Sequence, residues 1–305
     1  MNGLDPAQLA AFSAVIDEGS FEAAARRLHV TPSAVSQRIK SLESRLGQVV
    51  VRRTRPAEPT EAGRVLQRLA TQTQLIEHEA LAALQGGMDG AAEPLRVPLA
   101  VNADSLSTWF MPALAKVPAE LTATFDIRAE DQDHSAALLR EGTVMAAVTA
   151  DSRAVQGCRV EPLGAMRYFA VASPEFCARF LPEGPSPDAL AGAPMLMFNR
   201  KDALQERFLR TLTGERLSPP VTYLPTSQGF LDAARLSLAW GMVPEQLLGT
   251  ALSHAEVMEI APGRYLDVPL FWQRWRLDSA VLDAVTRAVH EAAAEYLRQP
   301  AGSAS

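Results

Sequence analysis

One stretch, residues 31–46 with the sequence TPSAVSQRIKSLESRL, constrains the fold more than any other part of the chain. Thr31 can cap a helix through its hydroxyl, Pro32 suits the first helical position, and Gly47 can end the helix. At helical periodicity the apolar side chains share one stripe, and short polar side chains occupy the opposite face. The stripe contains Val35, Ile39, Leu42 and Leu46, and the polar side contains Ser33, Ser36, Gln37, Lys40, Ser41 and Ser44.

The polar face of this helix suits the major groove of double-stranded DNA. Serine and glutamine side chains such as Ser33, Ser36 and Gln37 can hydrogen-bond to base edges, and Lys40 can reach a phosphate. We expect Thr31 and Pro32, at the start of the helix, to contact DNA as well. Most amphipathic helices also have a polar outer face, so periodicity alone fits a solvent-exposed helix in any globular protein. The flanking sequence is needed to decide between the two interpretations.

Two further helices are predicted before this stretch. Asp5 and Pro6 begin the first, whose apolar residues recur at helical spacing until about Gly19. Ser20 caps a second and shorter helix with the sequence FEAAARRL. Three helices in this order are typical of a helix-turn-helix in which the last helix reads DNA. The apolar run 49–51, followed by RRTRP, predicts a wing in which Arg52 and Arg53 can contact DNA.

Charge is distributed unevenly along the chain. The segment 38–55 contains six cationic residues and one anionic residue, so it carries a formal charge of +5. The chain as a whole carries −6, and the remainder therefore carries −11. A local basic segment on an acidic protein indicates a dedicated DNA-binding domain rather than general coating of nucleic acid.

Length and composition limit the class of protein. A chain of 305 residues is too long for one ordinary core and predicts two or three domains. It is 48% hydrophobic and 21% charged, with a mean hydropathy of −0.01, which is typical of a globular chain in water. It has no apolar run near the roughly 20 residues that span a bilayer, and no secretory signal pattern. We therefore expect a cytoplasmic protein that does not contact a membrane.

The cysteines and histidines form no catalytic or metal-binding motif. Cys158 and Cys177 are too few for a disulfide framework and lack metal-ligand spacing, which fits a reducing compartment. The five histidines are scattered, and the HExxH, GxSxG and GxxxxGK[ST] patterns are missing from the sequence. We expect neither an enzyme nor a bound metal or cofactor.

Residues 1 to about 85 resemble the winged helix-turn-helix of the LysR-type transcriptional regulators. In most of that family the wing ends in phenylalanine followed by RTR, whereas this chain reads GQVVVR at 47–52. That departure, together with TPSAVSQRIKSLE, resembles the ArgP/LysG branch, also called IciA, which regulates export of basic amino acids. The residues that carry the family match are Leu9, Phe12, Val15, Gly19, Ser20, Phe21, Ala24, Ala25, Leu28, Thr31, Ser33 to Gln37, Ile39, Leu42 and Glu43.

A long helix is predicted from Glu61 to about Gln85, with Thr60 as its cap. Its apolar and small residues follow steps of four and three, a repeat of 3.5 residues that is typical of helices pairing with each other. The family resemblance implies a dimerising linker helix, although the same pattern fits a helix packed on its own domain. GGMDGAAEP then predicts a hinge. The seam consists of Ala62, Leu66, Leu69, Thr73, Ile76, Ala80 and Ala83.

From residue 95 onward, short apolar runs alternate with helical patterns, which predicts an α/β domain with largely parallel sheets. The family resemblance implies a two-lobed effector domain related to periplasmic binding proteins, with a cleft between the lobes. The whole chain is then an α+β multidomain protein. Its expected parts are a winged helix-turn-helix at 1–60, linker helix and hinge at 61–94, lobe 1 at 95–164 plus 266–298, and lobe 2 at 165–265. The predicted strands are 95–101, 122–128, 144–149, 166–173, 194–198, 221–224, 241–244 and 267–272.

The first predicted strand leads into a candidate effector site. Free N–H groups at the start of the next helix, with the Ser105 and Thr108 hydroxyls, can hold the α-carboxylate of an amino acid. The same residues can simply cap the helix. NADSLSTWF at 102–110 resembles the ArgP/LysG branch, which favours a site that includes Asp104 and Trp109.

Further candidates for the effector site follow other strands. Glu130, Asp131 and Asp133 can pair with a cationic side chain, although a solvated turn explains them equally well. Thr226 and Ser227 lie where a helix N-terminus can face the cleft. Trp272 and Trp275 follow the last strand, and we expect one of them in the core.

Residues and resemblance together predict a sequence-specific transcriptional regulator that responds to L-lysine or L-arginine and activates a gene for an exporter of these amino acids. The implied partners are a double-stranded DNA operator, RNA polymerase, and further copies of the chain in a dimer or a dimer of dimers. Paired recognition helices then read the two halves of a near-palindromic operator. Two alternatives stay open: a LysR-type regulator with another small effector, and a nucleoid or replication-origin protein that binds A·T-rich DNA without a ligand.

Overall fold

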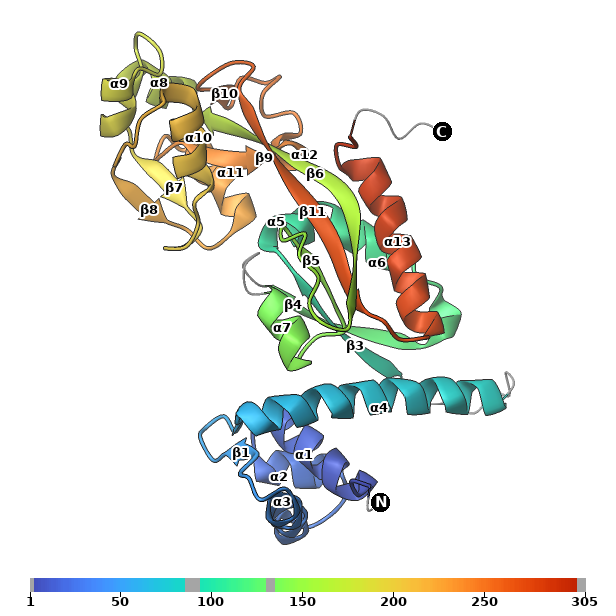
Figure 1. Ribbon diagram of the computed structural model, residues 1–305. Coiled ribbons are helices and arrows are strands. Elements are labelled where there is room, and N and C mark those ends of the chain that lie inside the picture. The colour runs from blue at the N-terminus through green and yellow to red at the C-terminus, as the bar shows by residue number, and fades with distance from the viewer. Residues whose placement is uncertain (1–2, 86–93, 130–134, 301–305) are drawn as a thin grey trace.

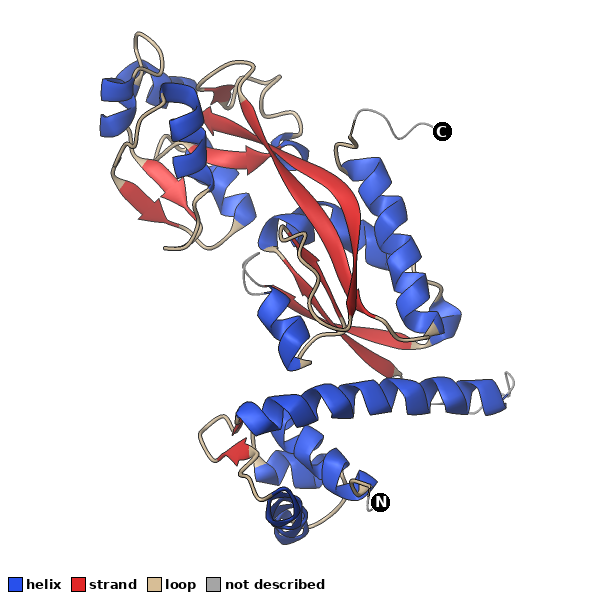
Figure 2. Cartoon of the chain, viewed as in Figure 1, coloured by secondary structure: helices blue, strands red, loops and turns tan. Residues whose placement is uncertain are grey.

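The computed structural model describes residues 3–85, 94–129 and 135–300. A small helical unit at the N-terminus lies against one side of a long helix, and an elongated α/β domain lies against the other side (Figure 1). Figure 2 shows that the α/β domain has helices around a sheet whose two longest strands run through its full length.

The N-terminal unit contains the three predicted helices, each begun by the predicted capping side chain. The Asp5 carboxylate accepts a hydrogen bond from the Ala7 N–H, and the Ser20 and Thr31 hydroxyls accept from N–H groups three residues later. Gly19 and Gly47, both in the left-handed conformation, follow the first and third helices. These helices are α1 (Pro6–Glu18), α2 (Phe21–Arg27) and α3 (Pro32–Leu46).

Helix α3 buries the predicted apolar stripe except at its end. Val35, Ile39 and Leu42 are at most 1% exposed and form the centre of the N-terminal core. Leu46 was expected on the same stripe, but it is 37% exposed. It occupies the last turn before Gly47, where the chain turns away from the core toward the wing.

The wing is a short antiparallel hairpin of β1 (Val51–Arg52) and β2 (Glu58–Pro59). It is fixed to the turn between α1 and α2, because the Ala57 N–H donates a 2.7 Å hydrogen bond to the Gly19 carbonyl. A Cβ atom at Gly19 would lie only 2.9 Å from the Cβ of Pro56, so this approach requires glycine.

Helix α4 (Glu61–Gln85) begins at Thr60, whose hydroxyl accepts from the Gly63 N–H as predicted. Its side chains lie on three different faces of the helix, two of them buried and one exposed. Leu66 and Ala70 are buried in the N-terminal core, whereas Leu75 is fully buried in the core of the α/β domain. Part of the predicted pairing seam therefore packs within the chain. Between these two faces runs an exposed apolar stripe of Val65, Leu69 and Ile76, which are 71%, 41% and 54% exposed.

The main sheet is mixed, so the expectation of largely parallel sheets was wrong. β3 is parallel to β4 and β5, but the long strands β6 and β11 are antiparallel to each other, because the chain leaves along β6 and returns along β11. The strand order is β10-β6-β11-β5-β3-β4, and β9 also pairs with β6. The strands are β3 (Leu95–Val101), β4 (Ala123–Ala129), β5 (Ala146–Thr149), β6 (Cys158–Ala172), β9 (Gly241–Pro244), β10 (Met258–Glu259) and β11 (Tyr265–Trp275).

We call the part built on β3, β4 and β5 lobe 1. A helix with a π-helical turn at its centre follows β3, and the last helix of the chain packs beside it. The Trp272 and Trp275 side chains are both buried in the core, although only one of them was expected there. The helices of lobe 1 are α5 (Ala103–Ser105), η1 (Leu106–Phe110), α6 (Met111–Ala115), η2 (Ala119–Leu121), α7 (Ser135–Glu141) and α13 (Ala280–Tyr296).

The chain between β6 and β11 forms lobe 2. Its small parallel pair, β7 (Met195–Met197) and β8 (Val221–Tyr223), joins the main sheet through a bridge between Met195 and Trp240, next to β9. The cuts between lobes expected at 164/165 and 265/266 lie inside β6 and at the start of β11. The helices of lobe 2 are α8 (Pro174–Phe180), α9 (Pro187–Gly192), α10 (Leu204–Thr213), α11 (Ser227–Arg235) and α12 (Glu245–Leu248).

Candidate functional site

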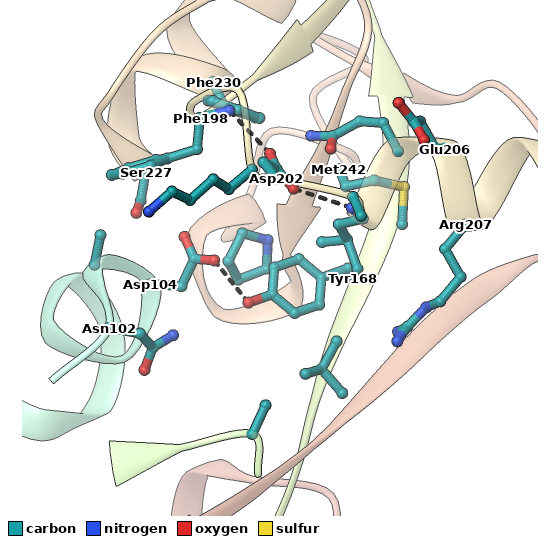
Figure 3. A pocket seen from close by; sticks show the side chains of 18 of the residues that line it. Asn102, Asp104, Tyr168, Phe198, Asp202, Glu206, Arg207, Ser227, Phe230 and Met242 are labelled. Atoms are coloured by element: carbon teal, nitrogen blue, oxygen red, sulfur yellow. Dashed lines mark hydrogen bonds between the residues drawn. The ribbon is translucent and has the colours of Figure 1, made fainter. Parts of the chain in front are cut away.

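A cavity of about 520 Å³ lies between the two lobes. Lobe 1 contributes the residues that directly follow β3 and β5, and lobe 2 contributes the loop after β7 with parts of α10 and α11. Residues of β6, β9 and β11 complete the lining (Figure 3). The volume lies within the range of cavities that enclose small metabolites.

The Asp104 carboxylate is the central acidic group of this cavity. It accepts a 2.6 Å hydrogen bond from the hydroxyl of Tyr168, which is 1% exposed on β6. Burial raises the pKa of Asp104, the nearby Ser227 and Tyr168 hydroxyls lower it, and the negative charge of Asp202 raises it. Burial also raises the pKa of Tyr168 well above its ordinary value, so its hydroxyl stays protonated as a donor.

The loop after β7 is held in shape by two polar side chains. Asp202 accepts hydrogen bonds from the N–H groups of Phe198 and Leu204, at 2.9 and 3.0 Å (Figure 3). Asn199 accepts through its side-chain oxygen from the N–H groups of Lys201 and Asp202. Both carboxylate oxygens of Asp202 are thus used within the loop, and Asp202 contributes negative charge to the cavity from a fixed position.

Several buried polar atoms at the cavity have no hydrogen-bond partner among the described residues. They include both side-chain atoms of Asn102, the Ser227 hydroxyl and the Oε1 atom of Gln205. These side chains are at most 4% exposed. The Ser227 hydroxyl faces Asp104 from lobe 2, but without the geometry of a hydrogen bond (Figure 3). Unpaired buried polar groups are unfavourable, so a polar ligand that supplies their partners gains binding free energy.

The structure places the predicted effector residues in different environments. Asp104 and Ser227 line the cavity from opposite lobes. Ser105, Thr108 and Thr226 are close in sequence but do not line it, and the Thr108 hydroxyl donates to the backbone oxygen of Asp104 at 2.7 Å. These roles stay predictions. Glu130 and Asp131, as well as Asp133, lie outside the described residues.

Trp109 lies in the core and not at the cavity. Its indole is fully buried and packs edge-on against the Phe110 ring, with the ring centroids 5.7 Å apart. A residue at this helix position can face either the sheet or the cleft, and the packing turns Trp109 to the sheet. Trp109 is therefore not part of the cavity lining, contrary to the prediction.

Sequence reasoning did not assign a role to Asn102, Tyr168 or Gln205. Asn102 directly follows a confirmed strand, which is where ligands sit in α/β proteins, so this position carried a usable signal. Tyr168 lies within a strand and Gln205 within a helix, where nothing in the local pattern distinguishes a cavity residue from a core residue.

A second surface is formed by α3 and the wing. The predicted DNA-contacting side chains are exposed there, except Ser36, which is half-buried. The hydroxyls of Thr31 and Ser33 are 2.9 Å apart, and Thr31 also caps the helix. Within the described chain, Lys40 has no ion pair with a carboxylate. The exposed set is Thr31, Pro32, Ser33, Gln37, Lys40, Arg52 and Arg53.

Two contacts hold side chains of this surface in place. The Arg53 guanidinium lies 5.1 Å above the centroid of the Phe21 ring, at the start of α2. The Gln8 amide of α1 donates a 3.0 Å hydrogen bond to the Ser41 hydroxyl of α3. The wing and the recognition helix are thereby both fixed to the helices behind them.

Comparisons with known proteins agree with this architecture. Residues 6–64 match the bacterial regulatory helix-turn-helix protein family of lysR type, and residues 93–294 match the LysR substrate binding domain. The chain belongs to the LysR family of transcriptional regulators. It is therefore a DNA-binding transcriptional regulator and not an enzyme.

The relatives place the chain near the LysG regulators. It is 48% identical over 295 residues to the HTH-type transcriptional regulator LysG of Mycobacterium tuberculosis, covering 97% of this chain and 95% of the relative. It is 42% identical over 296 residues to the lysine export transcriptional regulatory protein LysG of Corynebacterium glutamicum, covering 97% and 100%. The full-length structure of LysG from C. glutamicum with bound effector Arg has a TM-score of 0.74 and 41% identity, covering 96% and 99%.

In residues 3–85, 94–129 and 135–300, no helix combines the length and the apolar character needed to cross a membrane. Over the same ranges, His, Cys, Asp and Glu side chains do not gather in groups of three that can hold a metal ion.

Proposed function

We propose that this LysR-type regulator binds L-lysine or L-arginine in the cavity between its lobes. The observation that carries the proposal is the set of unpaired buried groups, Asn102 and Ser227, around the acidic Asp104. An amino acid supplies both donors and acceptors for the amide and hydroxyl, and its cationic group pairs with the carboxylate. We keep Ser105, Thr108 and Thr226 as flanking residues whose part in binding is to be tested.

The cavity is lined by charged side chains of both signs, which suits a basic amino acid with its carboxylate and two cationic groups. Asp104 and Asp202 both contribute negative charge, and the charge of Asp202 raises the pKa of Asp104. The cationic side chains of the lining can pair with the α-carboxylate of the ligand; they are Lys201, Arg207 and Arg210. A ligand cation beside Asp104 relieves the repulsion between Asp104 and Asp202, whereas an acidic side chain would increase it. The only cationic group of a neutral aliphatic amino acid is its α-ammonium group. We therefore expect basic amino acids to bind more tightly than leucine or glutamate.

The relatives support the same choice of effector and suggest the target. A relative is named as a lysine export regulator, and its structure contains bound Arg. We infer that the present protein activates a gene for an exporter of lysine or arginine when one of them accumulates. Activation requires the DNA-bound regulator to favour RNA polymerase at the promoter, so polymerase is a proposed partner, and the proposed location is the cytoplasm.

We propose that the protein works as a homo-oligomer. Val65, Leu69 and Ile76 expose an apolar stripe on α4 that neither the N-terminal unit nor lobe 1 covers. Pairing of two such helices buries the stripe and presents two recognition helices to the two halves of an operator. A dimer or a dimer of dimers satisfies this geometry. In this division of the chain, residues 1–60 bind DNA and residues 61–94 hold the protomers together.

The test is calorimetric titration of the full-length protein with L-lysine, L-arginine, L-leucine and L-glutamate. We expect saturable binding of the basic amino acids only, and loss of that binding in Ser227→Ala and Asn102→Ala. Ser107→Ala is the matched control, because the Ser107 hydroxyl bonds to its own helix and does not line the cavity. If none of the four amino acids binds, the effector is another metabolite and the choice of lysine or arginine is wrong.

The same titration tests the alternative function, that of a nucleoid or replication-origin protein that needs no ligand. Such a protein would have no use for a cavity with unpaired buried groups at Asn102 and Ser227. DNA footprints with and without the bound amino acid separate the two functions. A footprint that the ligand does not change would favour the ligand-independent protein.

A further inference from the structure

Helix α4 is attached to lobe 1 along one of its faces. Leu75 is fully buried in the core of the α/β domain. One turn farther on, the Glu79 carboxylate accepts hydrogen bonds from the Ser279 hydroxyl at 2.5 Å and the Val281 N–H at 3.3 Å, at the start of α13. Near its N-terminus, Arg64 lies 3.6 Å from Glu141. The helix is thus held to lobe 1 at several separate points.

The closest of these contacts surrounds Arg68. A Cβ atom on Gly142 would lie 2.2 Å from the Arg68 Cα, and a Cβ on Gly157 would lie 2.5 Å from its Nη2 atom. Both glycines have positive φ angles, +76° and +82°. The Arg68 guanidinium also donates a 3.1 Å hydrogen bond to the Gln156 carbonyl. Arg68 therefore occupies a slot between the two glycines, with its backbone against Gly142, where no side chain fits, and its guanidinium against Gly157.

The segment that contains Gln156 and Gly157 leads directly back to the cavity. Ala150 lines the cavity, and the chain runs from there through 151–157 to the slot. The buried Gln273 side chain on β11 holds this segment by donating to the carbonyls of Asp151 and Arg153 and by accepting from the Val155 N–H. Three hydrogen bonds thus fix the shape of the segment that joins the cavity wall to the slot.

On its other side, α4 is part of the N-terminal unit. Leu66 and Ala70, which flank Arg68 in sequence, are buried in the core beneath the recognition helix. The Gln74 amide donates a 3.4 Å hydrogen bond to the Ser13 hydroxyl of α1. A movement of α4 at Arg68 consequently moves the DNA-binding unit as well.

We propose that Arg68 is the positioning residue through which the cavity wall at 150–157 acts on the DNA-binding unit. The proposal rests on the proposed function, in which the cavity binds an effector. Ligand that shifts Ala150 displaces the Gln156 carbonyl and Gly157, and these move the Arg68 guanidinium and α4 with it. By linkage, DNA that favours one position of α4 must also favour one state of the cavity wall.

The first test measures hydrogen exchange in the full-length protein and needs no effector. The DNA is a duplex recovered by in vitro selection with the same protein. We expect binding of this duplex to change the exchange of amides 151–157 by about fivefold or more in the wild type. In Arg68→Ala this change is expected to vanish, while Arg64→Ala, which loses a contact on the same face, keeps it.

Two results of this exchange experiment would overturn the proposal. One is a wild-type segment 151–157 whose exchange does not respond to DNA. The other is an Arg68→Ala protein that responds as the wild type does. Equal losses in the Arg64→Ala and Arg68→Ala proteins would also overturn it, because general packing of α4 would then carry the coupling.

The second test uses L-arginine and L-lysine as probes and measures coupling directly. Duplex affinity is measured by fluorescence anisotropy with and without saturating amino acid. We expect a wild-type coupling of roughly 5-fold to 150-fold, falling below about twofold in Arg68→Ala and in Gly157→Ala, which narrows the slot from the other side. Calorimetry should show amino-acid affinities within about threefold of wild type in both variants.

The two tests separate the failure of this inference from the failure of the effector assignment. If neither amino acid binds the wild type, the effector assignment is wrong, and the exchange experiment alone decides on Arg68. If the amino acids bind and Arg68→Ala retains the full wild-type coupling, the role of Arg68 is wrong while the effector assignment stands.

Discussion

The Tyr168 hydroxyl donates a hydrogen bond to Asp104 across the cavity and so connects the two lobes. Asp104 follows β3 of lobe 1, whereas Tyr168 lies on the part of β6 that pairs with β9 of lobe 2. This bond orients the carboxylate before any ligand arrives. A ligand that binds Asp104 therefore contacts a carboxylate that is already hydrogen-bonded between the two lobes.

Asp104→Asn should separate ligand binding from stability. The folded protein raises the pKa of this carboxyl, so at neutral pH the charged group is less favourable in the folded chain than in the unfolded chain. The amide removes that cost and still accepts from Tyr168, and we expect the Tm without ligand to rise by about 1–3 °C. Affinity for L-arginine should fall at least about tenfold, because the charge-assisted hydrogen bond is lost.

Calorimetric scans and titrations check both parts of this prediction, with Ser107→Ala as the control. A lower Tm in Asp104→Asn would contradict the idea that the buried charge is unfavourable. Unchanged affinity for L-arginine would remove Asp104 from the binding site.

Effector affinity should depend on pH through Asp104. Burial raises the pKa of the free carboxyl, and a ligand cation beside it lowers that pKa again. Binding therefore favours the deprotonated form, and affinity for L-arginine should decrease as the pH falls through the pKa of the unliganded protein. Titrations in two buffers with different ionisation enthalpies should reveal proton release on binding. A pH profile identical in wild type and Asp104→Asn would assign the dependence to another group.

Gln37→Ala should weaken binding to the selected duplex by about tenfold, because a bidentate contact to a base contributes roughly 1–3 kcal/mol to discrimination. Gln37 is exposed on the outer face of α3 and is free to reach a base edge. Binding to random DNA should change less than about twofold, since it depends on phosphate contacts. Anisotropy titrations with both duplexes decide the matter, and Ser44→Ala, farther along α3, is the control. Equal losses on both DNAs would exclude Gln37 from base readout.

Phe21→Leu should weaken DNA binding through Arg53. The ring supports the guanidinium from 5.1 Å, and a contact of this kind at an exposed site is worth about 0.5–1 kcal/mol, or roughly a twofold to fivefold change in affinity. Log affinity for DNA falls as log salt concentration rises, and Arg53→Ala should make this negative slope shallower by about one. In the Arg53→Ala background Phe21→Leu should then have no further effect. An additive double variant would mean that Phe21 acts only through packing of α2.

Ile76→Asp should disrupt the oligomer. Ile76 is 54% exposed on the apolar stripe of α4, and an aspartate at the centre of a helix pair buries an unpaired charge. We expect light scattering after size-exclusion chromatography to show a monomer at micromolar concentration, and operator affinity to fall with it. Glu77→Ala, one position along the helix, should keep the wild-type mass. An unchanged mass for Ile76→Asp would place the main interface elsewhere.

Local signals in the sequence were sufficient for most secondary structure. Capping residues and the helical stripe located α3 to the residue, because these are interactions within one helix. Strands β3 and β9 likewise have the predicted bounds. The first half of β6 was missed, since Pro162 and Gly164 interrupt the strand pattern and only pairing with β11 compensates for them.

The cavity was only partly predictable, because it is assembled from segments far apart in the sequence. Asp104 and Ser227 follow strands, and this general rule located them. Tyr168 and Gln205 carry no such signal. Their place at the cavity depends on residues that are distant in the sequence, and nothing in the adjacent sequence indicates it. The burial of Trp109 has the same origin: its indole packs on Phe110, which in turn packs on Trp272 of the distant β11.

The two strands shared by the lobes make lobe 2 an insertion and not an appended module. Both β6 and β11 run without interruption from one lobe into the other, with Gly164 and the irregular pairing at Leu270/Phe271 near the middle. A truncation or gene fusion that ends at either point would expose a row of unpaired backbone groups along the remaining half-strand. Recombination between relatives should therefore exchange the whole two-lobed domain, or replace lobe 2 through both strands at once.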